Sequence, residues 1–178
     1  MSSLSPYSII IDCETLGKSP SSIITEIAAV AFDRNTFAVV DTLECFPDIL
    51  SQLAAGRTWT ADTIAFHQKK ASLPNRLVGS DITSTLFQFH SFIKKHDPQW
   101  VWIQGPDFDR PLIENLFEAE GGSLPWDYWR TADTRTTWNL AFPGIKHDPR
   151  PHHALPDCLA TLKDLQSCLL KLQCLTAA

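Results

Sequence analysis

Near its start the chain has a short, continuous apolar run that is followed by two acids. The run extends from Tyr7 to Ile11, Asp12 and Glu14 come directly after it, and Gly17 ends the segment. Consecutive β-branched residues are typical of a buried strand, since the apolar residues of a surface helix would recur every three or four positions. Because residues two apart on a strand point to the same face, Asp12 and Glu14 should project two carboxylates together at the end of a core strand.

The next stretch predicts a hairpin. Residues 23–32 and 37–46 are two apolar, β-rich runs, and the turn formers of residues 33–36 lie between them. Two such runs joined by a short polar turn indicate antiparallel strands, which together with the first strand give a three-stranded antiparallel unit. Glu26 interrupts the first of these runs. We expect Glu26 to be exposed on its strand, the alternative being a supporting acid close to a functional site.

Helical and strand patterns alternate in the rest of the chain. The expected elements are, in order, a loop over 47–60, a helix over 60–70, a loop over 72–79, a helix over 82–96 with Asp81 as its N-cap, a strand over 100–104, a helix with apolar positions 112, 113, 116 and 117, a fifth strand over 128–132, a helix capped by Asp133, and a last helix that starts near Pro156. This order predicts an α/β sandwich whose sheet has an antiparallel half and a parallel half.

The composition is that of an ordinary globular domain. The chain has 178 residues, 44% of them hydrophobic and 20% charged, so we expect a single domain over residues 1–178 with a sizeable core. The formal net charge of −5 argues against a broad basic surface that grips long duplex DNA. It still allows the end of a nucleic acid to be held at one metal site.

Cysteine usage and hydropathy predict a cytoplasmic protein without a membrane span. The five cysteines are odd in number and include no C-x-x-C pair, which indicates reduced thiols in a core rather than a disulfide framework. The N-terminal segment lacks the basic region of a signal peptide, and no segment approaches the ~18 apolar residues of a transmembrane helix. The six tryptophans leave two interpretations open: core packing, which we favour, and a partner surface such as that of a homodimer.

The paired acids at the end of the first strand suggest a metal site. Two like charges held this close repel each other, and burial increases the cost of keeping both ionised. A divalent cation would remove this cost, and hard ions such as Mg²⁺ prefer carboxylate oxygen. The alternative is a solvated turn in which Asp12 and Glu14 are incidental.

Two further groups of residues have a spacing that suits the same site. One is the segment 104–109, which ends in Asp109 where a strand gives way to a helix. The other is the segment 152–157, with His152 five residues before Asp157 at the start of the last helix. Taken singly, each acid could equally be an N-terminal cap or a partner of the helix dipole, and a single histidine is more often a surface residue than a catalyst.

Together these groups resemble the DEDDh branch of the DEDD 3′–5′ exonucleases, which have an RNase H-like fold. The family motif D-x-E is matched by Asp12 and Glu14, the motif F-D by Phe108-Asp109, and the motif H-x4-D by His152 and Asp157. The resemblance spans nearly the whole chain. The form of residues 105–109 and the run 133–136 look closest to the phage and bacterial exonuclease VIII-like group, which includes compact exoribonucleases.

The resemblance implies a metal-dependent hydrolase that removes nucleotides from the 3′ end of single-stranded DNA or RNA. Two ions, Mg²⁺ or Mn²⁺, roughly 3.5–4 Å apart would stabilise the attacking and leaving oxygens. Asp12 would bridge both ions, Glu14 and Asp157 would complete the ion on the nucleophile side, and Asp109 would complete the other. His152 would be the general base, since a pKa near 6.5 suits proton transfer near neutral pH.

The resemblance also implies that Thr15 and Leu16, just after the first motif, contact the terminal nucleotide. Two departures from the family pattern leave roles open: His153 adjoins His152, and Asp107 precedes Asp109. Two other functions remain as alternatives, a catalytically silent relative that binds nucleic acid or acts as a scaffold, and a metal-dependent nucleotide phosphohydrolase.

Overall fold

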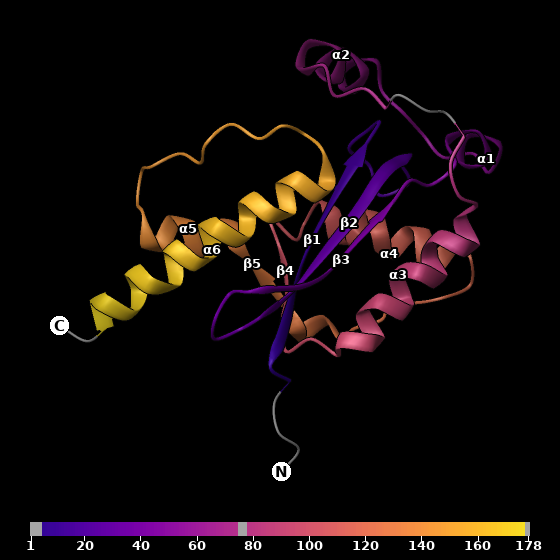
Figure 1. Ribbon diagram of the computed structural model, residues 1–178. Coiled ribbons are helices and arrows are strands. Elements are labelled where there is room, and N and C mark those ends of the chain that lie inside the picture. The colour runs from indigo at the N-terminus through magenta and orange to yellow at the C-terminus, as the bar shows by residue number, and fades with distance from the viewer. Residues whose placement is uncertain (1–4, 75–77, 177–178) are drawn as a thin grey trace.

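The computed structural model describes residues 5–74 and 78–176, so part of the expected loop over 72–79 lies outside the described residues. The described strands are β1 (Tyr7–Thr15), β2 (Ile24–Asp33), β3 (Val39–Cys45), β4 (Val101–Ile103) and β5 (Thr131–Asp133). The described helices are α1 (Ile49–Ala54), α2 (Ala61–Lys70), α3 (Ile82–His96), α4 (Asp109–Ala119), α5 (Thr134–Ala141) and α6 (Ala154–Thr176). Figure 1 shows α6 on one face of the sheet and α3 and α4 on the other.

The strands form one mixed sheet in the order β3-β2-β1-β4-β5. The first three strands pair antiparallel, while β4 pairs parallel with both β1 and β5. This arrangement confirms the predicted antiparallel and parallel halves. The central strand β1 pairs with β2 along its whole length, from Tyr7 opposite Asp33 to Thr15 opposite Ile24, which fixes the position of its last residues in the molecule.

The alternation of side chains along β1 divides the core into two layers. Ile9 and Ile11 point to one face and pack in a cluster with α3 and α4. Ile10 points to the opposite face, where it packs with Cys158 and Leu165 of α6. Asp12 and Glu14 continue this second series, so both carboxylates emerge on the same face of the sheet, as the sequence predicted, and this is the face that α6 covers.

The expectation of a loop over residues 47–60 is wrong, because the short helix α1 lies within it. Asp48 caps this helix by accepting a hydrogen bond from the backbone amide of Ser51, 2.6 Å away. The buried amide of Gln52 attaches the helix to β2: it accepts from the backbone N–H of Ile24 and donates to its carbonyl, at 2.9 and 2.8 Å. A local cap and one buried polar side chain therefore stabilise a helix too short for a periodic pattern.

The fifth strand also differs from its prediction. Residues 128–130 form a 3₁₀ helix, and β5 begins at Thr131, opposite Val101 of β4. The neighbouring strand β4 has three residues, so it can pair with three residues of β5, and β5 is therefore shorter than predicted. Tyr128 and Trp129, which the sequence placed in the fifth strand, are instead 70% and 59% exposed.

Cysteines follow the prediction more closely than tryptophans do. Four cysteines are buried free thiols and Cys174 is an exposed one. Core packing explains the buried Trp126, but Trp59, Trp100 and Trp129 are 55%, 39% and 59% exposed, so the preference for core packing is wrong for these three. Within residues 5–74 and 78–176, no helix combines the length and the apolar character needed to cross a membrane.

Candidate active site

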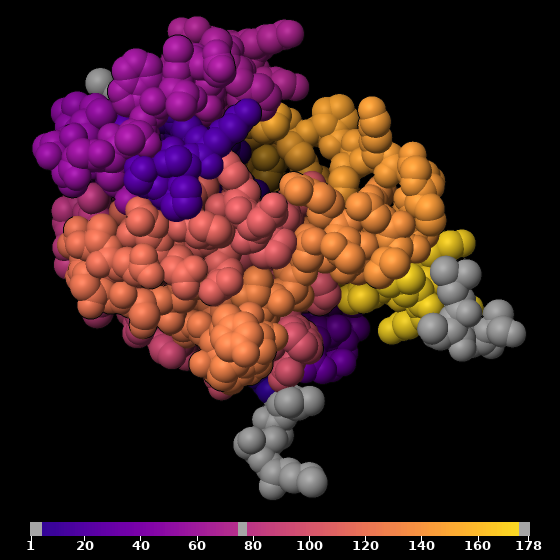
Figure 2. Space-filling view, turned by 180° about the vertical axis from the view of Figure 1, so that it is seen from behind, coloured from indigo at the N-terminus to yellow at the C-terminus, as the bar shows by residue number. Residues whose placement is uncertain are grey.

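A cavity of about 440 Å³ opens at the C-terminal end of β1 and gathers the predicted site residues. Its lining includes Asp12, Glu14, Asp109, Asp157 and His152. In Figure 2 the surface is hollowed where the indigo N-terminal segment, the coral segment around α4 and the orange segment after β5 meet. The fold therefore brings together, from three distant parts of the chain, the groups that the three motifs predicted.

The two acids of β1 lie deep in this cavity. Burial, followed by the nearby carboxylates of Asp109, Glu14 and Asp157, raises the pKa of Asp12 well above its usual range. Burial and the charge of Asp157 raise the pKa of Glu14 to about 8. Both shifts have the same physical origin, since a buried carboxylate surrounded by like charges is costly to ionise.

Asp157 lies in the first turn of α6 and faces the same cavity. One of its oxygens, Oδ2, accepts a hydrogen bond of 3.2 Å from the backbone amide of His152. The other, Oδ1, is buried without a hydrogen-bond partner among the described residues. Burial raises the pKa of this carboxyl as well. A buried oxygen without a partner is costly for the fold unless a ligand completes it.

Asp109 is the first residue of α4 and is 5% exposed. The thiol of Cys13, on the face of β1 opposite to Asp12, donates to Asp109 Oδ1 at 3.1 Å. Burial raises the pKa of Asp109 to about 6, and the bond from Cys13 opposes this shift. The carboxylate is thus held in place from the strand that supplies two of the other acids.

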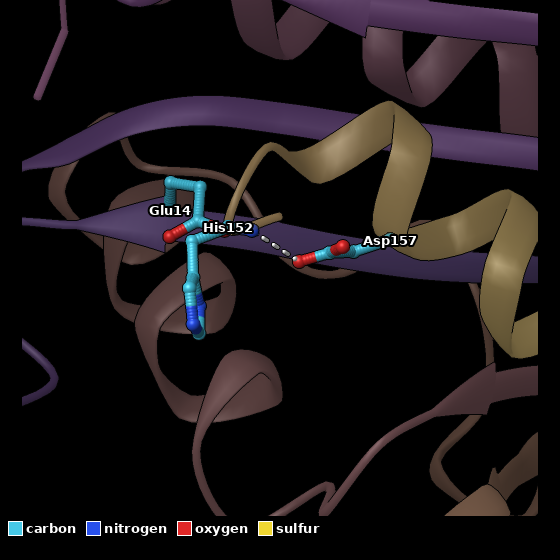
Figure 3. Close-up of side chains that lie close together, drawn as sticks. All are labelled: Glu14, His152 and Asp157. Carbon is cyan, nitrogen blue, oxygen red and sulfur yellow. Dashed lines mark hydrogen bonds between the residues drawn. The ribbon is translucent and has the colours of Figure 1, made fainter. Parts of the chain in front are cut away.

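His152 and His153 point into different surroundings. The ring nitrogen of His152 and carboxylate oxygens of Glu14 and Asp157 all lie within 4.8 Å of one another (Figure 3). The imidazole of His153 instead contacts Glu26, with Nδ1 3.2 Å from Oε1. Of the two adjacent histidines, His152 lines the cavity with the acids, whereas His153 does not.

The backbone of His152 has an unusual conformation, with φ of 60°. A residue with a side chain pays a steric cost in this left-handed region, and such strain is often found at functional sites. The imidazole packs edge-on against the ring of Phe66, at a centroid distance of 4.8 Å. Burial, with a contribution from Lys70, lowers the pKa of His152, so the ring is neutral and able to accept a proton near neutral pH.

The expectation that Glu26 is exposed is wrong, because the structure buries it to 6% exposure. It lies opposite Glu14 in the β1–β2 pairing. Its Oε2 accepts a hydrogen bond of 3.0 Å from the backbone amide of Ala154, the first residue of α6. The carboxylate of Glu26, in β2, therefore accepts a hydrogen bond from one of the backbone amides that have no partner within the first turn of α6, the helix that carries Asp157.

The two predicted substrate contacts have different environments. Thr15 lines the cavity, and its hydroxyl donates to the carbonyl of Gly17 at 2.7 Å. Leu16 packs with Ile23 and Ile49 in a small buried cluster. The predicted contact of Leu16 with a nucleotide has no support from this placement of its side chain. Asp107, one of the open alternatives, is exposed on the loop before α4.

Sequence reasoning missed the residues that form the walls of the cavity. Phe66 and His67 of α2 line one side, where the buried His67 Nε2 donates to the carbonyl of Thr15 at 3.0 Å and anchors the helix to the end of β1. Arg135 and Arg150 also line the cavity. The helical composition of residues 60–70 gave no indication that His67 would be buried against the end of β1. Arg135 lies within the run 133–136 noted above.

The donor set fits hard divalent cations. Asp12, Glu14, Asp109 and Asp157 offer carboxylate oxygen, the ligand type that Mg²⁺ and Mn²⁺ prefer. A bound cation would contact the buried Oδ1 of Asp157, which has no hydrogen-bond partner among the described residues. It would also stabilise the ionised forms of Asp12 and Glu14, whose pKa values are raised in its absence. Glu14, His152 and Asp157 form the tightest group, while Asp12 and Asp109 line the same cavity.

These pKa shifts predict that the metal-free protein loses stability as the pH rises. Glu14 has a pKa of about 8 in the folded protein, raised from 4.5, so the folded state holds a proton that the unfolded state releases between these values. Stability is then greatest below pH 4.5 with respect to this group and falls as the pH approaches 8. In chelator, the melting temperature at pH 8 should be lower than at pH 5 by at least about 2–4 °C, the effect of one pKa unit in a domain of this size.

Mg²⁺ or Mn²⁺ should raise the melting temperature more at pH 8 than at pH 5, because the cation binds the ionised carboxylates of the folded state. Differential scanning calorimetry at both pH values, with and without metal, measures both effects. A metal shift that is independent of pH would place the cation away from Glu14.

Solved structures of exonuclease I share this fold. The zinc-bound E. coli exonuclease I complex with single-stranded DNA has a TM-score of 0.68 and 17% identity, over 90% of this chain and 39% of that chain. E. coli exonuclease I in complex with a dT13 oligonucleotide gives 0.68 and 16%, over 93% and 41% of the two chains. The chain spans about 40% of the length of such structures. The likeness confirms the predicted RNase H-like architecture.

Sequence comparison identifies the family. No curated relative matches the chain significantly. A model of one domain family, described as the 3′–5′ exoribonuclease Rv2179c-like domain, matches residues 7–169. This range runs from the first residue of β1 into α6 and contains all four acids and His152. The chain belongs to the 3′–5′ exoribonuclease Rv2179c-like domain family.

Proposed function

We propose that this protein is a metal-dependent 3′–5′ exoribonuclease of the DEDDh type that acts on single-stranded ends. The observation that carries the proposal is the cavity at the end of β1, which collects Asp12, Glu14, Asp109, Asp157 and His152 and leaves one buried oxygen of Asp157 without a partner among the described residues. Family membership supports RNA as the substrate. The E. coli exonuclease I complexes with single-stranded DNA support a single strand.

In this proposal each group has a defined task. The four carboxylates would hold the cations. Bound Mg²⁺ or Mn²⁺ would supply charge stabilisation for the attacking and leaving oxygens. The imidazole of His152 accepts the proton of the attacking water at its free ring nitrogen, and its lowered pKa keeps that nitrogen unprotonated near neutral pH. A ring nitrogen of His152 lies within 4.8 Å of carboxylate oxygens of Glu14 and Asp157, which supports this role.

The dimensions of the site support action on a chain end. A volume of about 440 Å³ lies at the low end of the range of small-ligand pockets, which suits a terminal nucleotide rather than a duplex. The α2 wall, with Phe66 and the buried His67, closes one side of the cavity next to Thr15. A strand that enters from the opposite side would therefore end in the cavity.

Digestion of labelled oligonucleotides tests this function. We expect 5′-labelled single-stranded RNA to shorten one nucleotide at a time with Mg²⁺ or Mn²⁺, and to remain intact in chelator. The same RNA with a 3′-phosphate and a fully paired blunt duplex should be degraded more slowly, and single-stranded DNA serves as the comparison for sugar preference. Internal cleavage, or shortening from the 5′ end, would contradict the proposal. Hydrolysis of a simple phosphomonoester without shortening of RNA would favour a nucleotide phosphohydrolase.

A further inference from the structure

Arg135 lines the cavity, and its side chain is held in place by the loop between β4 and α4. It is the second residue of α5 and is exposed, yet it lines the cavity that holds the four acids. Its guanidinium lies against Gly105, where an added Cβ would be 2.7 Å from the guanidinium carbon and both terminal nitrogens. One of those nitrogens donates to the carbonyl of Gln104 at 3.2 Å. The side chain is thus laid flat along the loop between β4 and α4.

Asp133 fixes the surroundings of this arginine. Its Oδ1 accepts hydrogen bonds from the backbone amides of Gly105, at 3.1 Å, and Arg135, at 2.9 Å. Its Oδ2 accepts from the hydroxyl of Thr136. One carboxylate therefore ties the loop that leads to Asp109 to the start of α5. None of the proposed catalytic residues lies in the run 133–136. Its contacts instead hold the guanidinium of Arg135 in one position.

The charges around the cavity suggest what Arg135 binds. The chain has a formal net charge of −5, and four of its acids line this cavity, so an anionic strand needs local positive charge to approach. Three cations line the cavity, Lys18, Arg135 and Arg150. Arg150 is bonded to Asp164, whereas the guanidinium of Arg135 donates to the neutral carbonyl of Gln104 and forms no ion pair among the described residues. A planar guanidinium matches a phosphate well.

We propose that Arg135 binds a backbone phosphate of the RNA, one nucleotide upstream of the scissile phosphate. This inference rests on the proposed exonuclease function. Arg135 lines the same cavity as the carboxylates, but it is exposed, whereas Asp109 and Asp157 are buried at 5% and 6% exposure, so it lies nearer the mouth of the cavity than the acids that would hold the scissile phosphate. A strand whose 3′ end reaches these acids passes Arg135 with its next phosphate. The arginine then sets substrate length and affinity rather than the chemical step.

Kinetics on substrates of two lengths test this assignment. With Mn²⁺, Arg135→Gln should raise the KM for an eight-nucleotide single-stranded RNA at least about tenfold, the worth of a charge-assisted hydrogen bond, and leave kcat within about twofold. The KM for a dinucleotide with a 5′-hydroxyl, which lacks the upstream phosphate, should be unchanged. Between 50 and 200 mM salt, the slope of log KM against log salt for the longer RNA should fall by about 0.7, the value for one lost phosphate contact on a single strand.

Two variants serve as controls. Arg34→Gln removes the same charge at the turn after β2, at the end of the sheet away from Glu14, and should leave KM and the salt slope at the wild-type values. Arg135→Lys keeps the charge but loses the flat fit on Gly105, and should give a smaller rise in KM with an unchanged slope. Melting temperatures of all variants establish that they are folded. If the glutamine variant is not, the rise in KM of the lysine variant on the longer RNA still tests the contact, and a wild-type KM there would overturn it.

The outcomes separate the two proposals. A wild-type protein that cleaves neither substrate contradicts the exonuclease function itself. A wild-type protein that cleaves both, with an Arg135→Gln variant whose KM and salt slope equal those of wild type, overturns the role of Arg135 alone. An equal loss on the dinucleotide and the longer RNA, or a loss confined to kcat, also overturns the upstream contact.

Discussion

Replacing Asp12 by Asn should lower the rate of RNA hydrolysis by at least about 10³-fold, because stabilisation by cations at such a site contributes several kcal/mol and each 1.4 kcal/mol changes a rate tenfold. Asp12 lines the cavity together with the other three acids, and burial and the charges of Asp109, Glu14 and Asp157 raise its pKa. Asn keeps the shape of the side chain but removes one negative charge, so it weakens the binding of the cations. Single-turnover rates with saturating Mn²⁺ measure the loss.

The same variant should not lose stability in chelator. The amide removes repulsion from the buried cluster, so the metal-free melting temperature should stay at or above that of wild type. The rise in melting temperature that metal produces in wild type should be smaller in the variant. A variant with full activity, or with an unchanged metal shift, would mean that the cations bind elsewhere.

The second large effect concerns His152. His152→Ala should slow the chemical step by roughly 10²–10⁴-fold, which is the usual contribution of a positioned acid–base group. Metal binding, followed by the melting shift with Mn²⁺, should be largely retained because the carboxylates remain. The acidic limb of the pH–rate profile should also weaken, since the variant lacks the group that must be unprotonated.

His152→Gly separates catalysis from stability at the same position. Glycine adopts φ of 60° at little cost, so this variant should keep the stability of wild type or exceed it by about 1 kcal/mol while losing as much activity as His152→Ala. His153→Ala is the matched control, because His153 contacts Glu26 instead of the cavity. Wild-type rates in His152→Ala together with an inactive His153→Ala would transfer the role of the base to His153.

The sequence was sufficient for the parts of the fold that rest on local periodicity. The continuous run before Asp12 made β1 recognisable, and the spacing of Leu86, Phe89 and Ile93 did the same for α3. The acids were predictable because strand alternation puts Asp12 and Glu14 on one face, and because the motif spacing related Asp157 to His152. Each of these relations holds within one element or across a few residues.

Contacts between distant elements were harder to predict. Glu26 looks like an exposed acid in its own strand, and it is buried because the amide of Ala154, 128 residues later, bonds to it. The helix α1 is held by Gln52, whose partner is Ile24 of another element. The choice between His152 and His153 likewise depends on the backbone turn at the start of α6, which no pattern in the sequence specifies.

Isotope labelling of the product tests the central claim most directly. The wild-type protein should be incubated with single-stranded RNA and Mn²⁺ in H₂¹⁸O, and the products analysed by mass spectrometry. Attack by water with departure of the 3′ oxygen predicts nucleoside 5′-monophosphates that carry one ¹⁸O, with no release in chelator. Products with a 3′-phosphate or a 2′,3′-cyclic phosphate, or turnover without metal, would show that Asp12, Glu14, Asp109 and Asp157 do not form the proposed hydrolytic site.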